Sequence, residues 1–309
     1  MKRSLTLDDK FFKRPDFPLA VRKERAQNLT PLHYHTFEEL VLIESGTADH
    51  LVNRAERFPI MAGDVFTIKP NSAHGYANPA NLALVNILFH PDRLSLPFPE
   101  MRKLPGYHAL FDLEPKYRRG HRFSSRLRLC LTDLKHALDL VREMEKELTQ
   151  RSPGYEFASL SSFMRLIAFL CRCYSRSTAP QSLPLLRVDK ALQYLESHYP
   201  EAVSIYSLTD QTHQSVNSLL RDFKAATGQS PIQYLLHLRL RKAADLLIER
   251  PELNITEAAL AVGFNDSNYF TRQFRQKFEI NPRSFKKAAL ASLGDLANLR
   301  ESLRRRYRR

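Results

Sequence analysis

One pattern of polar and apolar residues occurs twice in the last third of the chain, and the two copies are separated by a constant offset of 51 residues. Residues of matching type stand in the same order in both: Asn217 and Asn268, Leu219 and Phe270, Arg221 and Arg272, Phe223 and Phe274, Pro231 and Pro282, and Tyr234 and Phe285. Self-similarity at a fixed offset is the signature of a repeated structural unit. We therefore expect one small unit that is built twice.

The second copy, residues 254–285, predicts a helix, a tight turn and a second helix. Its apolar residues recur at intervals of three and four, and Gly263 interrupts this spacing once. Asp266 and Ser267 stand where the second helix would begin, and a side-chain oxygen there can accept hydrogen bonds from the free amides of a first turn. The expected apolar face contains Ile255, Ala258, Ala259, Val262, Phe264, Tyr269, Phe270, Phe274 and Phe278.

The opposite face of the second helix in each copy carries Asn, Ser and Arg side chains. These suit the major groove of DNA, where Asn pairs with adenine edges and Arg with guanine edges or phosphate. An ordinary helical hairpin with a solvated face would explain one copy, but two equivalent faces favour DNA recognition. The predicted base-reading residues are Asn217, Ser218 and Arg221, then Asp266, Ser267, Asn268 and Arg272, and the predicted phosphate contacts are Lys224, Arg275 and Lys277.

The segment between the recognition helices, residues 231–248, predicts a single connecting helix. Its apolar positions have helical spacing: Tyr234, Leu235, Leu238, Ala243, Leu246 and Leu247. A helix of about 18 residues is roughly 27 Å long. Successive major grooves are about 34 Å apart, so this helix can hold two recognition helices for neighbouring grooves.

The charge balance supports a polyanionic partner. The 309 residues carry a formal net charge of +14, and the part from Arg187 onward has 20 basic and 13 acidic residues, a balance of +7. Such charge suits DNA, although charge alone would suit a membrane surface equally well. No apolar run approaches the length of a membrane span, and the first residues lack the apolar core of a signal peptide. We therefore expect a cytoplasmic protein with no membrane partner.

The three cysteines, an odd number, argue against a disulfide scaffold. Cys171 and Cys173 are close in sequence, but on the helix expected there they point to nearly opposite sides. This spacing argues against a shared metal site, so we expect both thiols to lie in the protein core.

The period of the apolar pattern changes to two between residues 21 and 89. Short alternating runs are separated by Gly46, by residues 59–63 and by residues 70–72. Many short strands with Gly and Pro between them predict a small antiparallel barrel or sandwich. One strand is expected to place five residues on a single face: His33, His35, Phe37, Glu39 and Val41.

Two segments of this region resemble the sequence motifs of cupin barrels. HYHTFEELVLIESG has the His-x-His, Glu and Gly spacing of the first motif, and AGDVFTIKPNSAHGY resembles the second. The resemblance implies that His33, His35, Glu39 and His74 converge inside a barrel. Such a set can hold Fe, Mn, Ni or Zn and can serve an oxygenase or isomerase reaction.

The competing interpretation is a sensor barrel with no metal and no other cofactor. Hydroxyl-rich molecules such as sugars suit a few fixed donors and acceptors in an apolar pocket. The DNA-binding half favours this interpretation, and the alternative is a cupin metalloenzyme or metal sensor fused to a DNA-binding domain. The predicted ligand-binding residues are His33, His35, Glu39, His74, Tyr76 and Asn86.

The remaining segments complete the predicted domain order. Three phenylalanines in residues 1–19 favour partial order there, and helical apolar stripes at residues 127–148 and 157–174 are typical of core helices or of a dimerisation element. The expected parts are a ligand-sensing and dimerisation domain over residues 1–174, a linker over 175–186, a DNA-binding domain over 187–290 and a basic tail over 291–309.

The DNA-binding half resembles the AraC/XylS family of bacterial transcription regulators over residues 188–287. The residues that carry the resemblance are Ile255, Ala259, Gly263, Phe264, Asp266, Ser267, Tyr269, Phe270, Phe274, Phe278, Pro282 and Phe285. Two departures lie in the first copy, where Thr209 replaces a small apolar residue and Thr212 and His213 occupy the turn. These departures are expected to affect the packing of the first motif.

The resemblance implies an architecture and a function. The first domain would be a cupin-like antiparallel barrel with helices for dimerisation at its C-terminal end. The second would be an all-α domain with two helix-turn-helix motifs. The chain would be a sequence-specific transcription regulator rather than an enzyme, with double-stranded DNA, a small-molecule effector, a second copy of the chain and RNA polymerase as partners. The barrel segments are most similar to those of sugar-responsive members, the rhamnose-responsive regulators in particular, so the expected effector is a sugar.

Overall fold

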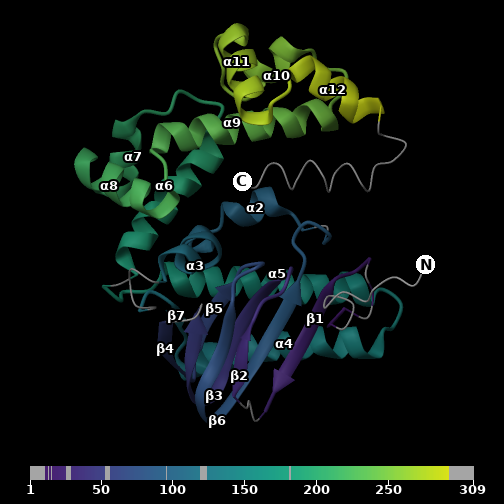
Figure 1. Ribbon diagram of the computed structural model, residues 1–309, viewed down its shortest axis with the longest axis vertical. Coiled ribbons are helices and arrows are strands. Elements are labelled where there is room, and N and C mark those ends of the chain that lie inside the picture. Colours follow the sequence, from purple (N-terminus) through teal and green to yellow (C-terminus); the bar gives the residue numbers. More distant parts are fainter. Residues whose placement is uncertain are drawn as a thin grey trace. The chain divides into compact units, whose positions relative to one another are not determined.

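The computed structural model divides the chain into two compact units, Met1–Lys190 and Ala191–Arg309 (Figure 1). The structure describes residues 11, 12, 14, 16–25, 29–52, 56–94, 96–118, 124–180 and 182–291. The expected basic tail, residues 291–309, lies outside this part of the chain except for its first residue.

The first unit contains a sheet with seven strands among the described residues. They are β1 (Leu19–Glu24), β2 (Thr30–His33), β3 (Glu38–Val52), β4 (Glu56–Met61), β5 (Asp64–Ile68), β6 (His74–Phe89) and β7 (Leu127–Arg128). The order is β1, β6, β3, β5, β7, while β2 also pairs with β6 and β4 with β3. Every one of these pairs is antiparallel, as predicted.

The inner face of the sheet is apolar, because residues opposite one another on paired strands point to the same side. Val41 of β3 lies opposite Asn86 of β6 and Phe66 of β5. The buried cluster on this face includes Val41, Ile43, Ala48, Phe58, Ile60, Phe66, Ile68, Tyr76, Leu82 and Leu84. Tyr76 and Asn86 are therefore polar residues on a hydrophobic interior face.

The expected strand through residues 33–41 is interrupted, which corrects the prediction. β2 ends at His33 and β3 begins at Glu38, so the four residues between them lie outside the sheet. Side chains on this connection do not follow the alternation of a strand. Phe37 consequently packs in a different buried cluster from Val41.

Phenylalanines of the N-terminal segment pack against this connection. Phe11 and Phe12 make edge-to-face contacts with Phe37, with ring centroids 5.4 and 5.3 Å apart. Phe12 is buried. Aromatic packing therefore gives this segment the order that its composition predicted, while residues 1–10 lie outside the described chain.

β3 is longer than predicted because it passes through Gly46 instead of ending there. Its pairing with β6 shifts register on both sides of this residue. Gly46 has a φ of 76°, and a Cβ atom at this position would lie 2.2 Å from the carbonyl oxygen of Asn81. Glycine is thus required by the close approach of two strands rather than by a strand break.

Two long helices, α4 (Leu131–Gln150) and α5 (Tyr155–Ser175), pack against each other, and Figure 1 shows them along one side of the sheet. Phe163 of α5 contacts Phe89 of β6, with ring centroids 4.9 Å apart. α5 is the one described helix long and apolar enough to cross a membrane, and half of its apolar window is buried. Because α5 packs against α4 and β6, its apolar residues are those of a core helix.

The described chain between β6 and β7 forms short helical turns. They are α2 (Phe98–Arg102), the π-helical turn η1 (His108–Leu113) and α3 (Glu114–Tyr117). After α5 the helix α6 (Leu183–His198) begins, and the division between the two units falls inside it. The predicted linker, residues 175–186, therefore includes the first turn of a helix.

The second unit is helical and contains the two predicted helix-turn-helix motifs. Its further helices are α7 (Ile205–Thr212), α8 (Val216–Thr227), α9 (Pro231–Glu249), α10 (Ile255–Ala261), α11 (Ser267–Phe278) and α12 (Pro282–Ala291). α8, α10, α11 and α12 all contact α9, which has 19 residues and is therefore about 28 Å long. The connecting helix thus lies where the sequence predicted it.

The turns of the two motifs have different solutions. Gly263 has a φ of 92°, and a Cβ atom there would lie 2.6 Å from the carbonyl oxygen of Pro200. In the first motif His213 adopts the left-handed conformation with a φ of 52°. Thr212 is buried and its hydroxyl donates to the Leu208 carbonyl at 2.9 Å. The buried hydroxyl of Thr212 is therefore satisfied by a local hydrogen bond.

Candidate functional site

Both recognition helices begin with a side-chain cap. At α8 the Ser215 hydroxyl accepts the backbone amide of Ser218 at 3.3 Å. At α11 the Asp266 carboxylate accepts the amides of Asn268 and Tyr269 at 2.7 and 3.0 Å. These contacts satisfy amides that a helix leaves free. They fix the residue at which each recognition helix starts, and so the direction of its first-turn side chains.

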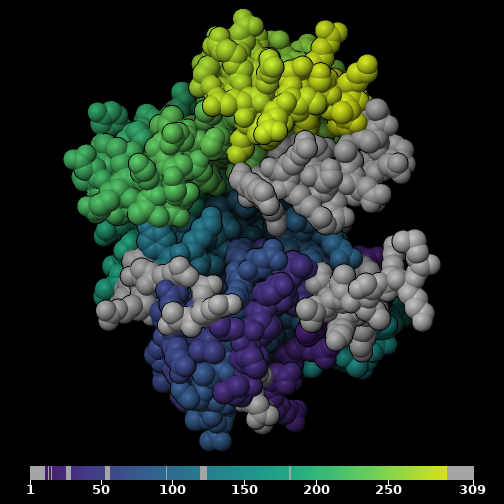
Figure 2. All heavy atoms as spheres, in the orientation of Figure 1, coloured from purple at the N-terminus to yellow at the C-terminus, as the bar shows by residue number. Residues whose placement is uncertain are grey.

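One face of α11 is buried and the other carries the predicted DNA contacts. Phe270, Phe274 and Phe278 pack into the core of the second unit, so residues on the opposite side of the helix face outward. The exposed residues are Asp266, Asn268, Arg272 and Arg275, while Ser267 and Lys277 are half-buried. This motif, yellow-green in Figure 2, lies at the surface in that view.

α8 repeats this arrangement. Leu219 and Phe223 are fully buried. The exposed residues are Asn217, Arg221 and Lys224, and Ser218 is half-buried. The Arg221 guanidinium donates to Ser218 Oγ and to Asp222 Oδ1, both at 3.0 Å. Surface contacts of this kind are weak, so Arg221 can exchange them for contacts with DNA.

Capping limits one predicted base contact. Hydrogen bonds from the amides of Tyr269 and Asn268 lower the pKa of Asp266, so its carboxylate stays ionised. Both amides bond to the same oxygen, Oδ1. Only the second carboxylate oxygen, Oδ2, is therefore available for a contact between Asp266 and a base.

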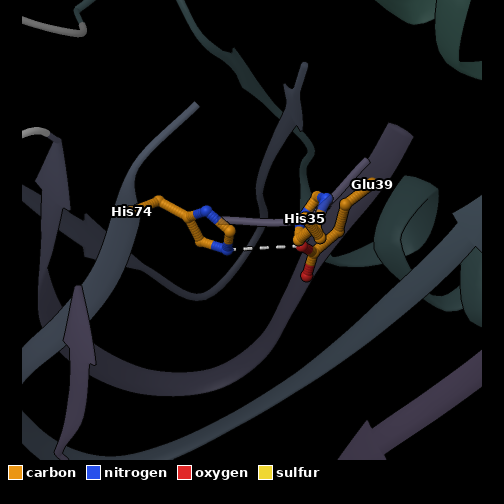
Figure 3. A group of neighbouring side chains, drawn as sticks. All are labelled: His35, Glu39 and His74. Carbon is orange, nitrogen blue, oxygen red and sulfur yellow. Dashed lines mark hydrogen bonds and ion pairs between the residues drawn. The ribbon is translucent and has the colours of Figure 1, made fainter. Parts of the chain in front are cut away.

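Three residues of the predicted sensor pocket converge in the first unit (Figure 3). Glu39 Oε2 lies 2.8 Å from His35 Nε2 and 3.4 Å from His74 Nε2. All three side chains are buried. Of the described residues, these form the one group of His, Cys, Asp and Glu whose ligand atoms could share a metal ion, since the atoms lie within 4.8 Å of one another.

His33 does not belong to this inner group, which corrects the predicted set of four. It is exposed at the end of β2 and pairs in register with His74, with ring centroids 4.2 Å apart. Its Nδ1 lies 3.0 Å from the Pro31 carbonyl oxygen. Partial burial and the neighbouring His74 lower the pKa of His33. Because the chain leaves the sheet after His33, this ring stays at the rim.

The interior of the first unit holds a buried carboxylate, Glu39, and a buried phenol, Tyr76. Burial alone would raise the pKa of Glu39, but hydrogen bonds with His35 and His74 outweigh burial and lower this pKa to about 2. Burial and the Glu39 charge raise the pKa of Tyr76 well above its usual value. Glu39 is therefore a charged acceptor and Tyr76 a hydroxyl donor at neutral pH.

Two further polar atoms lie in the same interior. Tyr76 Oη and Asn86 Oδ1 are buried and have no hydrogen-bond partner among the described residues. An unpaired buried polar group costs about 1–3 kcal/mol, which a bound polar molecule can recover.

The sequence analysis did not predict His50 as a residue of this interior. Its ring is fully buried, and its centroid lies 5.6 Å from that of Tyr76 and 4.8 Å from that of Phe66. The alternation of side chains along β3 could have predicted this inward position.

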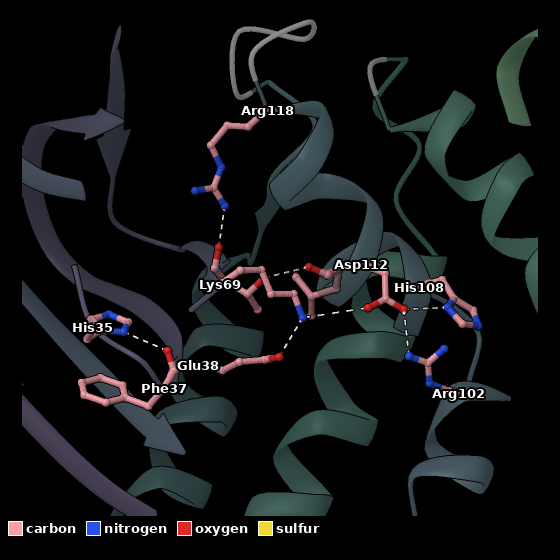
Figure 4. A network of polar contacts seen from close by, with 10 residues as sticks. His35, Phe37, Glu38, Lys69, Arg102, His108, Asp112 and Arg118 are labelled. Atoms are coloured by element: carbon pink, nitrogen blue, oxygen red, sulfur yellow. Dashed lines mark hydrogen bonds and ion pairs between the residues drawn. The ribbon is translucent and has the colours of Figure 1, made fainter. Parts of the chain in front are cut away.

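A network of charged groups connects β3 and the residue after β5 to η1 (Figure 4). Lys69 Nζ lies 3.0 Å from Glu38 Oε1 and 3.9 Å from Asp112 Oδ1. Asp112 Oδ2 is 2.9 Å from His108 Nδ1 and 3.9 Å from Arg102. Burial alone would raise the pKa of Asp112, but Arg102 and His108 lower it well below its usual range. These charge pairs hold η1 beside Glu38, the neighbour of Glu39 in the sequence.

Comparisons with known proteins establish the family. Residues 19–153 match the family described as an AraC-like ligand binding domain, and residues 208–288 match a helix-turn-helix domain. The chain is 32% identical over 288 residues to the HTH-type transcriptional activator RhaS of Escherichia fergusonii, with 92% of this chain and 97% of that protein covered. The chain belongs to the AraC family. Its first unit is a ligand-binding domain and its second a DNA-binding domain, so this AraC-family protein is a transcription regulator.

Three further proteins are similar to this AraC-family chain. RhaS of Escherichia coli O6:H1 is 30% identical, covering 89% of this chain and 94% of that protein. A probable AraC family transcriptional regulator from Rhodopseudomonas palustris is 28% identical over 33% of this chain and 96% of its own, with a TM-score of 0.32. ToxT from Vibrio cholerae is 13% identical over 87% of this chain and 96% of its own, with a TM-score of 0.33. The assignment rests on the sequence relatives.

Proposed function

We propose that this regulator reads a two-part DNA site through α8 and α11, with α9 holding them for neighbouring major grooves. The observation that carries the proposal is the equivalent exposure of Asn217 with Arg221 and of Asn268 with Arg272, each pair opposite a buried apolar face. The proposed base readers are Asn217, Ser218, Arg221, Asp266, Ser267, Asn268 and Arg272, and the proposed phosphate contacts are Lys224, Arg275 and Lys277.

The ligand of the first unit is a small hydroxylated molecule, and a sugar fits best. Sugar hydroxyl groups both donate and accept hydrogen bonds, so they complement a carboxylate acceptor and the unpaired polar atoms of Tyr76 and Asn86. The proposed ligand contacts are His33, His35, Glu39, His74, Tyr76 and Asn86. The ligand must bind one conformation of the protein more tightly than another, because equal affinity for both would not change DNA binding.

Several finer properties belong to the same proposal. The chain acts in the cytoplasm, activates transcription through contact with RNA polymerase, and has no catalytic activity of its own. Two relatives named as transcriptional activators support activation. A homodimer is built on α4 and α5, and the exposed apolar side chains Leu131 and Phe157 support self-association there. The proposed domain limits are 1–174 for sensing and dimerisation, 175–186 for the linker, 187–290 for DNA binding and 291–309 for the tail.

The test is selection of bound fragments from random duplex DNA by the full chain, with and without a panel of sugars. We expect one enriched site with two elements about 10 base pairs apart, and one sugar that changes affinity for it. Equal affinity for every duplex at matched salt contradicts the DNA-reading proposal. An enriched site whose affinity no sugar changes contradicts the sugar proposal alone.

A single substitution then locates the sugar. Tyr76→Phe removes one hydroxyl and keeps the buried ring. The variant should bind the sugar more weakly by about 1–3 kcal/mol, because one buried hydrogen bond is lost, while its affinity for the enriched DNA site without sugar stays unchanged. An unchanged sugar response would place the ligand elsewhere.

A further inference from the structure

We propose that a hollow in the surface of the first unit binds a small phosphorylated molecule. Three arginines line it, Arg126, Arg128 and Arg176, and its volume is about 650 Å³. We call it the arginine hollow. Ligand pockets in proteins span about 300–1,000 Å³. Of the described residues that line the hollow, none belongs to the predicted sensor pocket. This site is therefore separate from the proposed sugar site and does not depend on the proposed function.

A buried carboxylate positions two of the three arginines. Asp64 is fully buried, and its oxygens lie 2.7 Å from Arg126 Nε and 2.7 Å from Arg128 Nε. Asp64 also lies opposite Arg128 where β5 pairs with β7. One carboxylate offsets only one of the two guanidinium charges. The pair therefore keeps a net positive charge at a fixed place in the hollow.

The third arginine comes from a different part of the chain. Arg176 directly follows α5 and is exposed. Its Nε donates to the Arg172 carbonyl oxygen at 3.2 Å, and its Nη2 lies 3.7 Å from Cys173 Sγ. Sulfur is a weak acceptor, so an anionic oxygen is a better partner for this guanidinium. Arg176 can therefore exchange the sulfur contact for a contact with a bound anion.

Positive charge exceeds negative charge around the arginine hollow. Asp133 is the one acidic residue among the described residues that line it, and with Asp64 the three arginines and two aspartates leave a balance of +1. Burial and the Asp133 carboxylate raise the pKa of the Cys173 thiol, so this thiol adds no negative charge at neutral pH. The N-terminus of α4, where Cys130 makes no side-chain capping hydrogen bond, adds about half a positive charge.

A phosphate group suits these donors better than a carboxylate does. A phosphate ester carries a charge of about −1.5 to −2 at neutral pH and has three acceptor oxygens, whereas a carboxylate has one negative charge and two oxygens. Guanidinium groups bind phosphate through two parallel N–H···O bonds. A phosphate group fills only part of the hollow. The remaining space borders Leu127 and the hydroxyl groups of Ser177 and Thr178, which suit the organic part of a phosphorylated molecule.

The ligand would connect two segments that are distant in sequence. Arg126 and Arg128 lie at β7, whereas Arg176 belongs to the segment between α5 and α6. That segment opens the predicted linker, residues 175–186. A phosphate held by all three arginines would therefore restrain the start of this linker against the sheet.

The test is calorimetric titration of the full chain with inorganic pyrophosphate at constant ionic strength. Pyrophosphate has phosphate oxygens but no sugar hydroxyl groups, so the proposed sugar site does not contribute. We expect saturable binding. Arg176→Gln should weaken this binding by at least about tenfold, because charge-assisted hydrogen bonds are lost. Arg176→Lys keeps the charge and should lose less affinity.

Asp133→Asn should change the affinity in the opposite direction. It should tighten pyrophosphate binding by about two- to fivefold, because repulsion between like charges at the surface is lost. Arg165→Gln, at an exposed position of α5 outside the hollow, is the matched control and should bind as the wild type does. Circular dichroism verifies that each variant is folded. Equal affinity of the wild type, Arg176→Gln and Asp133→Asn would overturn the proposal.

Two further outcomes would also overturn it. Loss of pyrophosphate binding in Arg275→Gln but not in Arg176→Gln would place the anion on the DNA-binding face. A shallower salt dependence of DNA affinity in Arg176→Gln would place a phosphate of DNA in the hollow instead of a small molecule. Selection of bound DNA by the full chain is a separate readout, so failure of this proposal leaves the regulator function untouched.

Discussion

The carboxylate of Asp189 accepts the backbone amide of Gly106 at 2.8 Å, and its second oxygen accepts that of Ala109 at 3.1 Å. Asp189 is 2% exposed. The two amides lie where η1 begins, and η1 also carries Asp112 of the charged network. All three residues belong to the first unit, so this contact fixes the start of η1 to the part of α6 that lies in the same unit.

Asp189→Ala is expected to lower the free energy of unfolding of the first unit by about 1–3 kcal/mol, because two buried amides lose their acceptor. Urea denaturation measures the change, and hydrogen exchange at Gly106 and Ala109 should accelerate. Asp189→Asn keeps one acceptor oxygen and should show a smaller loss. Wild-type exchange at both amides in the alanine variant would show that the contact is not formed in solution.

Arg272→Ala should weaken binding to the selected DNA site by about 1–3 kcal/mol and relax the preference at one base pair, because a base-edge contact is lost. Repeated selection with the variant measures both effects. Arg250→Ala, an exposed position outside the recognition helices, serves as the matched control and should change neither. Unaltered preference with Arg272→Ala would show that this residue does not read a base.

Arg275→Gln should weaken binding to all DNA sequences alike, because a phosphate contact carries no base information. The slope of log affinity against log salt should become shallower by about 1. Lys224→Gln in the first motif should behave in the same way. A change of base preference without a change of slope would move either residue to the base-reading group.

The cap of α11 should fail in acid. Because the folded pKa of Asp266 is lowered below its usual 3.8, its contribution to stability is complete above the unfolded pKa and is lost as the pH falls through the folded pKa. Asp266→Ser retains an acceptor that does not titrate in this range. Hydrogen exchange at Asn268 and Tyr269, measured from pH 5 downward, should therefore accelerate in wild type relative to the serine variant. Parallel pH profiles would contradict the capping role.

Alanine substitutions at two glycines with left-handed backbones distinguish the cost of a steric clash from the cost of the backbone conformation. Gly263→Ala must place its Cβ atom 2.6 Å from the Pro200 carbonyl oxygen, whereas at Gly228 no atom lies within 4 Å of that position. Both substitutions incur the left-handed penalty of about 1 kcal/mol. Thermal unfolding should show a clearly larger loss for Gly263→Ala. Equal losses would mean that the turn relaxes away from Pro200.

The helical half could be predicted because its determinants are local. Apolar spacing of three and four defines the buried faces, a cap residue defines the start of α11, and the 51-residue offset identifies the pair. The first two signals act within a few residues and the offset is read by comparing the sequence with itself, so no tertiary information was needed. The capping use of Asp266 was also visible, but which of its oxygens stays available was not.

The sensor pocket depended on contacts between distant residues. The sequence alone determined an antiparallel first domain, two helix-turn-helix motifs and the set His33, His35, Glu39 and His74. Only the tertiary structure decided that three of these meet while His33 stays at the rim. The physical reason is that convergence depends on the pairing of β3 with β6 and on the point where the chain leaves the sheet, and neither follows from the period of the sequence.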